Sequence, residues 1–95
     1  MDRIRVLIVD DSVVACRALA DAVASDPSLE VAGTALSGLI ALKKLPLVHP
    51  DLIMLDIDMP EMDGIQTLGE IRKIHPRLPV IICSGLAEKG NSYTM

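Results

Sequence analysis

The stretch Leu52-Ile-Met-Leu-Asp-Ile-Asp-Met-Pro-Glu-Met-Asp-Gly64 decides the fold, because an unbroken apolar run leads directly into an aspartate and then into an acidic turn. A run such as Leu52 to Leu55 is typical of a strand that is covered on both faces. Pro60 prevents this strand from continuing into a regular ladder. We therefore expect Asp56 at the carboxyl end of a strand, the edge where parallel α/β sheets bind ligands. We interpret Asp56 as the chemical centre.

The rest of the chain alternates between strand and helix patterns. Apolar runs and helical spacing predict strands over 5–10, 30–34, 52–55 and 80–83, with helices over 13–25, from 37 through 42, and over 65–74. Ser12 and Ser37 can cap the first two helices. Pro46 is expected to end the second helix early, because a proline removes a backbone hydrogen bond. The alternation predicts an α/β fold, a doubly wound parallel sheet with helices on both faces.

The spacing of apolar residues also predicts which helix faces are buried. In the first helix these residues are Cys16, Leu19, Ala20 and Val23. In the second they include Leu39 and Leu42, and in the third they are Ile65, Leu68, Ile71 and Ile74.

Size and composition indicate one small globular domain. The chain has 95 residues, of which 51% are hydrophobic and 23% charged, which is ordinary for such a domain. A net charge of -4 and a single aromatic residue, Tyr93, argue against a nucleic-acid partner. No apolar run approaches the roughly 20 residues of a membrane helix, and no signal peptide precedes the first strand. We therefore expect no membrane partner and a cytoplasmic location.

The cysteines and histidines show no paired spacing of a metal or redox site. Cys16 and Cys83 fall in apolar surroundings on different elements, so we expect small buried thiols rather than a disulfide. His49 and His75 each precede a proline in a turn and are expected at the surface.

Three predicted strands end in polar side chains. Asp10 and Asp11 follow the first strand, Asp56 closes the third, and Ser84 follows the fourth. If these strands are neighbours about 4.8 Å apart, three carboxylates and a hydroxyl converge on one edge. Carboxylates this close repel each other, and a divalent cation removes the strain. Asp10 or Asp11 with Asp56 and a backbone carbonyl near Asp58 could hold magnesium, which prefers oxygen ligands.

With a metal in place, Asp56 is a plausible nucleophile toward phosphorus, because carboxylates form aspartyl-phosphates. Ser84 would donate a hydrogen bond to a phosphoryl oxygen, and Gly85 would leave space beside it. The pair Asp56-Ile-Asp58 also suggests a phosphatase of the haloacid dehalogenase type. That class places its aspartate pair after the first strand and needs a larger chain, which makes it the weaker hypothesis.

The segments Val9-Asp-Asp-Ser12, Leu55-Asp56, Met59-Pro-Glu-Met-Asp-Gly64 and Ser84-Gly85 together resemble the receiver domain of a two-component response regulator. The resemblance covers the whole chain. It implies a flavodoxin-like sheet with the strand order 2-1-3-4.

The resemblance also implies a role for each residue of the predicted site. Asp10 and Asp11 position magnesium, and Asp56 accepts phosphate from a histidine kinase. Asp58 ligates the metal through its main-chain carbonyl, and Ser84 is the switch hydroxyl.

Within the receiver family, three segments are most similar to the amino-terminal regulatory domain of chemotaxis protein-glutamate methylesterases: Ile4-Arg-Val-Leu7, Leu29-Glu-Val-Ala-Gly-Thr-Ala35 and Ile82-Cys-Ser-Gly-Leu-Ala-Glu-Lys-Gly90. This similarity implies a bacterial chemotaxis regulator whose parent chain carries an output domain. The chain itself has no constellation for ester hydrolysis, so we do not expect it to be an enzyme.

The chain departs from the family at its end. Receivers have five strands and five helices, and a lysine closing strand five pairs with the phosphoryl group; Lys89 does not match that lysine. We therefore expect residues 1–95 to form a single receiver domain truncated after strand four, with weak phosphorylation at best. A degenerate receiver that serves only as an interaction module is an alternative. Strand four, at 80–83, would present an exposed apolar edge, which predicts a homodimer through that edge or through exchanged elements.

Overall fold

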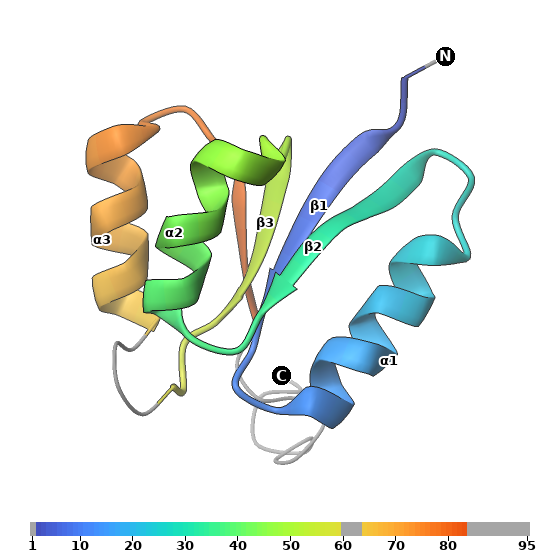
Figure 1. The fold of residues 1–95 in the computed structure, drawn as a ribbon, viewed down its shortest axis with the longest axis horizontal. Helices are drawn as coiled ribbons and strands as arrows, with labels where there is room; N and C mark the ends of the chain where they lie inside the picture. Colours follow the sequence, from blue (N-terminus) through green and yellow to red (C-terminus); the bar gives the residue numbers. More distant parts are fainter. Residues whose placement is uncertain (1, 60–63, 84–95) are drawn as a thin grey trace, which may run out of the picture.

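The computed structural model describes residues 2–59 and 64–83. In this part, four parallel strands form one sheet in the order β2-β1-β3-β4, with helices on both faces (Figure 1). The α/β prediction and the predicted strand order are both confirmed. The elements are β1 (Ile4–Val9), α1 (Val13–Ala24), β2 (Leu29–Ala35), α2 (Gly38–Val48), β3 (Leu52–Asp56), α3 (Gly64–Ile74) and β4 (Val80–Cys83).

The central strand β1 serves two hydrophobic layers, because successive side chains of a strand point to opposite faces. Leu7 and Val9 pack in the layer formed with α2 and α3, whereas Val6 and Ile8 pack in the layer formed with α1. All four side chains are at most 1% exposed. Figure 1 shows the same division, with α1 alone on one side of the sheet and α2 beside α3 on the other. Because β1 is buried between the two layers, its position is fixed, and so is the point at which Asp10 leaves the sheet.

Helix α1 begins and packs as its sequence predicts. Ser12 is the N-cap, and its hydroxyl accepts a hydrogen bond of 3.1 Å from the backbone N–H of Ala15. Cys16 and Val23 are buried, and the half-buried Leu19 and Ala20 pack against them. Ser37 caps α2 in the same way, through the N–H of Ile40 at 3.2 Å.

The predicted buried face of α3 is wrong at both ends of the helix. Ile71 is fully buried and Leu68 packs against the core, but Ile65 is 63% exposed and Ile74 is 57% exposed. Steps of three residues fall short of a full turn by about 60°, so Ile65 and Ile74 lie on opposite sides of the helix. The fully buried Thr67 takes the place that the pattern gave to an isoleucine.

The second helix shows a smaller error of the same kind. Leu42 packs against the core, but Leu39 is 46% exposed. Ala41 and Leu45 form the buried face instead.

Helix α2 does not end early, because it runs through Pro46 to Val48. Near the end of a helix, a proline removes only one backbone bond, and its fixed φ is compatible with helical geometry. Leu45 is 3% exposed and Val48 packs against the core, so the last turn is anchored on both sides of the proline. His49 then caps the helix in a left-handed conformation with φ 48°, and its N–H donates to the Leu45 carbonyl at 3.2 Å.

A cluster around Arg5 ties the elements together at the amino end of the sheet. The Arg5 guanidinium pairs with the Glu30 carboxylate on β2 and donates to the Val48 carbonyl at 2.9 Å. The Arg5 backbone N–H donates to the Asp51 carboxylate at 2.9 Å, and the Asp51 N–H donates to the Arg5 carbonyl at 2.8 Å. We call these four residues the Arg5 cluster.

The two edges of the described sheet differ. On β2, Thr34 offers its carbonyl to the Lys44 ammonium of α2 at 2.5 Å. On β4, Ile81 is 48% exposed and Ile82 is 42% exposed, and within the described residues the strand pairs only with β3.

Candidate functional site

Three carboxylates gather at the carboxyl end of β1 and β3. Strand β1 pairs in parallel with β3, with Val9 opposite Leu55, so Asp10 leaves the sheet beside Asp56. Asp10, Asp11 and Asp56 each offer a carboxylate oxygen, and these oxygens all lie within 4.8 Å of one another. Asp10 is 6% exposed and Asp56 is 3% exposed, while Asp11 is exposed. We call these three residues the acid cluster.

Local hydrogen bonds orient the two buried members of the acid cluster. The N–H of Ser12 donates to Oδ1 of Asp10 at 2.9 Å, and the N–H of Asp58 donates to Oδ1 of Asp56 at 3.1 Å. In both cases a carboxylate accepts from the backbone two residues further along, as in an Asx turn. One oxygen of each carboxylate is thereby engaged, and the Asp58 main chain is held next to Asp56.

The electrostatics of the acid cluster disfavour the ionised form of Asp56. Burial is the main cause that raises the pKa of the Asp56 carboxyl to about 6. The hydrogen bond from the Asp58 N–H lowers this pKa, whereas the charges of Asp10, Asp11 and Asp58 raise it further. Among the described residues, the ion pairs join Arg5 to Glu30 and Lys73 to Glu70. No basic side chain of these residues therefore forms an ion pair with the acid cluster. The cluster therefore holds like charges at close range in a largely buried position.

The donor set of the acid cluster fits a small divalent cation. Carboxylate oxygens are hard ligands of the kind that magnesium takes, typically one or two of them together with water and phosphate oxygens. A cation among the three aspartates would offset the repulsion between the carboxylates, which adds to the rise in the pKa of Asp56 that burial causes. The turn holds the Asp58 main chain beside Asp56, and the assignment of its carbonyl as a metal ligand stays a prediction.

Several residues assigned from the sequence lie outside the described residues. Among them are Ser84 and Gly85, the predicted phosphoryl-binding pair, and Lys89. Glu61 and Asp63 are also outside, and we interpret them as loop and helix-start charges rather than ligands. The neighbouring strand is described up to Cys83, which lies opposite Asp56 in the register of β3 and β4.

The two thiols flank the acid cluster without joining it. Both cysteines are free, as predicted, and the Cys16 thiol donates to the Asp10 carbonyl at 3.2 Å. Cys16 is buried, but Cys83 is only half-buried because β4 lies at the edge of the described sheet. Burial, followed by the charge of Asp10, raises the pKa of both thiols, which makes them poor nucleophiles. His49 and His75 are exposed, as predicted.

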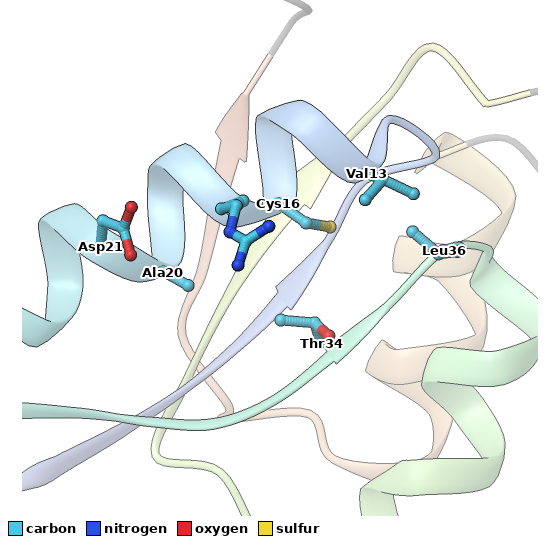
Figure 2. Close-up of a pocket in the computed structure, with 7 residues that line it drawn as sticks. Val13, Cys16, Ala20, Asp21, Thr34 and Leu36 are labelled. Atoms are coloured by element: carbon cyan, nitrogen blue, oxygen red, sulfur yellow. The ribbon is translucent and has the colours of Figure 1, made fainter.

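A shallow pocket of about 370 Å³ lies between α1 and the end of β2 (Figure 2). Cys16 contributes to its wall, so the pocket lies behind the residue that contacts Asp10. None of the three acids lines it. The lining residues are Val13, Cys16, Arg17, Ala20, Asp21, Thr34 and Leu36.

Two residues close in sequence to Asp56 are packed more tightly than the sequence indicated. Met59 is 6% exposed and belongs to the larger core cluster. Gly64 was noted as part of a motif, yet it lies directly against the backbone of Asp56 and Ile57. No periodicity in the sequence could have signalled this contact.

Comparisons of the sequence and of the fold with known proteins agree with one another. A family model described as "Response regulator receiver domain" matches residues 6–94. A protein-glutamate methylesterase/protein-glutamine glutaminase of Trichodesmium erythraeum is 46% identical over 95 residues, which is 100% of this chain and 27% of that protein. The enzyme of the same name from Clostridium acetobutylicum is 43% identical over 95 residues, again 100% of this chain and 28% of that protein. The chain thus spans about a quarter of the length of these curated relatives.

Solved structures show the same similarity. The response regulator domain of Thermotoga maritima CheB superposes with a TM-score of 0.82 at 43% identity, covering 93% of this chain and 65% of that one. A chain of the CheX-CheY-BeF3-Mg complex of Borrelia burgdorferi superposes with a TM-score of 0.80 at 33% identity, covering 94% of this chain and 67% of that one.

Among the helices of the described residues, none has the length and apolar character needed to cross a membrane.

Proposed function

The chain belongs to the response regulator receiver family, and from this premise we propose that Asp56 accepts a phosphoryl group from a histidine kinase. The observation that supports the proposal is the acid cluster itself, in which the oxygens of Asp10, Asp11 and Asp56 lie within 4.8 Å of one another at the carboxyl end of the sheet.

The proposed reaction uses the Asp56 carboxylate as nucleophile. Oδ1 accepts the hydrogen bond from the Asp58 N–H, so Oδ2 is the oxygen that attacks phosphorus. The new O–P bond forms as the P–N bond of a phosphohistidine breaks, and the imidazole leaves with the electron pair. A carboxyl whose pKa is about 6 is mostly ionised at neutral pH, so the nucleophile is present.

We assign the magnesium ligands to Asp10, Asp11 and Asp56, with the main-chain carbonyl of Asp58. When bound there, magnesium neutralises negative charge on the transferring group. Outside the described residues, Ser84 and Gly85 are proposed to contact the phosphoryl oxygens. Ser84 and Gly85 would bind and orient the phosphoryl group, and Asp56 alone forms a covalent bond with its phosphorus.

The wider context follows from the relatives. Two of them are named protein-glutamate methylesterase/protein-glutamine glutaminase, so we infer that this receiver serves a chemotaxis regulator and that an output domain accompanies it in a longer parent chain. Ester hydrolysis is assigned to that output domain and not to this chain.

Intact mass spectrometry tests the phosphoacceptor role. The protein is incubated with magnesium and acetyl phosphate, and we expect a mass gain of one phosphoryl group that EDTA abolishes. Asp56→Asn should abolish the gain. Asp58→Asn is the matched control, because it removes a neighbouring carboxylate but keeps the main-chain carbonyl, and it should retain the gain.

A mass gain that survives in Asp56→Asn would refute the assignment. The absence of any gain in the unsubstituted protein would favour the alternative of an interaction module. Steady turnover of phosphate esters would favour the phosphatase hypothesis.

We further propose that the chain forms a homodimer through β4. The observation that favours this is the pair Ile81 and Ile82, which are 48% and 42% exposed on a strand that pairs only with β3 among the described residues. Exposed apolar edges promote pairing between chains. Light scattering should show a concentration-dependent dimer, and Ile82→Lys should shift it toward monomer. A monomer at all concentrations would contradict the proposal.

A further inference from the structure

Gly64, the first residue of α3, lies against the backbone on which Asp56 is mounted. A methyl group built on Gly64 would lie 2.6 Å from the Asp56 carbonyl oxygen and 2.8 Å from Cγ2 of Ile57, and it would overlap with Cα of Ile57. Two of these three neighbours are backbone atoms, which cannot rotate away. The position therefore accepts no side chain while Asp56 and Ile57 stay in place.

The glycine is required for space and not for an unusual backbone conformation. Its φ lies outside the left-handed region, so an alanine would meet no backbone strain there. Gly64 is buried, and its N–H donates to the Ile57 carbonyl at 3.1 Å. This bond joins the first residue of α3 to the residue that follows β3.

We propose that Gly64 is a positioning residue for the magnesium and phosphoryl site, an inference that rests on the proposed function. Close approach of the α3 start holds the Asp56–Ile57 peptide, and the hydrogen bond from the Asp58 N–H to Asp56 Oδ1 transmits that position to the carboxylate. Any side chain at residue 64 must push the two segments apart. The shift moves Asp56 relative to Asp10 and Asp11, which are carried by β1.

Gly69 provides a matched control within the same helix. It also lies in α3, but it is exposed, and a methyl group built on it would meet nothing within 4 Å. Gly69→Ala should therefore keep the acid cluster intact and stabilise the helix slightly, because alanine favours helices over glycine. The two substitutions make the same chemical change and differ only in what the methyl group contacts.

The test measures magnesium affinity from the rise in Tm over a magnesium titration, for the unsubstituted protein, Gly64→Ala and Gly69→Ala. We expect Gly64→Ala to bind magnesium about 10- to 100-fold more weakly, the range seen when the supports of metal ligands are removed. Gly69→Ala should match the unsubstituted protein. Phosphorylation by acetyl phosphate at saturating magnesium is measured alongside and should fall in Gly64→Ala alone.

A folded Gly64→Ala with unchanged magnesium affinity overturns the inference. If the variant unfolds in buffer, trimethylamine N-oxide, which favours compact states, is added to all three proteins. A variant that still does not fold overturns the inference in favour of a purely structural glycine.

The double variant Ile57→Ala/Gly64→Ala, with Ile57→Ala alone as its reference, separates the two kinds of contact. Ile57→Ala removes the Cγ2 contact and leaves the backbone overlap, so magnesium binding by the double variant should stay weak. Full recovery would overturn the inference, because it would assign the loss to side-chain crowding. Failure of the unsubstituted protein to bind magnesium or accept phosphate is a different result, which refutes the proposed function itself.

Discussion

The two ends of the sheet arrange their charged side chains in opposite ways: opposite charges pair at the amino end, whereas like charges gather at the carboxyl end. At the amino end, the Arg5 guanidinium lies between the Glu30 carboxylate and the Val48 carbonyl, so charge and hydrogen-bonding groups are matched. At the carboxyl end, Asp56 lies with Asp10 and Asp11, and its pKa is raised to about 6 by burial and by its neighbours.

The difference separates stability from function within one small sheet. In the Arg5 cluster, the charged and hydrogen-bonding groups pair with one another, and these bonds connect β1, β2 and the last turn of α2. In the acid cluster, like charges lie close together in a largely buried position, which disfavours the ionised form of Asp56, and a bound cation would offset that repulsion. Unrelieved like charge in a largely buried position is thus the feature that marks the functional end.

Asp56→Asn should produce the largest change in stability. A folded-state pKa of about 6 in place of the ordinary 3.8 means that the stability contributed by protonated Asp56 is present below about pH 4 and is lost as the pH rises through 6. Without divalent cations at about pH 8, the substitution should therefore raise the free energy of unfolding by up to about 3 kcal/mol. Urea denaturation measures it, and a gain of the same size at pH 4 would show that the charge of the buried Asp56 carboxylate is not its cause.

Arg5→Met should act at the opposite end and in the opposite direction. It leaves Glu30 without its ion pair and the Val48 carbonyl without its donor, so the free energy of unfolding should fall by about 1–2 kcal/mol. Lys73→Met is the control, because it breaks the more exposed pair with Glu70 and should cost at most about 0.5 kcal/mol. The gain in Tm on adding magnesium should be the same in both variants, and a lost gain in Arg5→Met would mean that the two ends are coupled.

Asp11→Asn should give the smallest change. Asp11 is exposed and water screens its charge, so the substitution should raise Tm without magnesium by less than Asp56→Asn does. The same substitution should reduce the gain in Tm on adding magnesium. Differential scanning calorimetry with and without the ion measures both effects, and a clear drop in Tm without magnesium would mean that Asp11 does not repel its neighbours.

The parts of the fold that depend on local pattern could be predicted from the sequence. Buried parallel strands are continuous apolar runs, and Ser12 and Ser37 cap helices through bonds that reach only three residues. The strand ends placed Asp10 and Asp56 at one edge because parallel strands share their direction. These relations require no knowledge of what packs against the element.

The features that depend on tertiary packing could not be predicted in this way. Pro46 stays inside α2 because Leu45 and Val48 hold the last turn against the core, and no local rule reports that anchoring. The face of α3 was misplaced because Thr67, a polar residue, lies at its centre. Gly64 approaches Asp56 through space, and a motif names the glycine without showing what it contacts.

The bond between Lys44 and the Thr34 carbonyl has a consequence for how copies of this chain can add to one another. The neighbouring Ala35 carbonyl accepts from the Asp10 N–H and so faces β1. Groups of successive residues in a strand alternate in direction, which turns the Thr34 carbonyl outward, where the Lys44 ammonium occupies it. A lysine at this place blocks a template for further strands on the β2 side. Of the two edges of the described sheet, β4 is therefore the one that offers the less obstructed template. If two copies pair through β4 as proposed, both use that edge, and the edge that remains on each side of the dimer is the β2 edge, where Lys44 binds the Thr34 carbonyl.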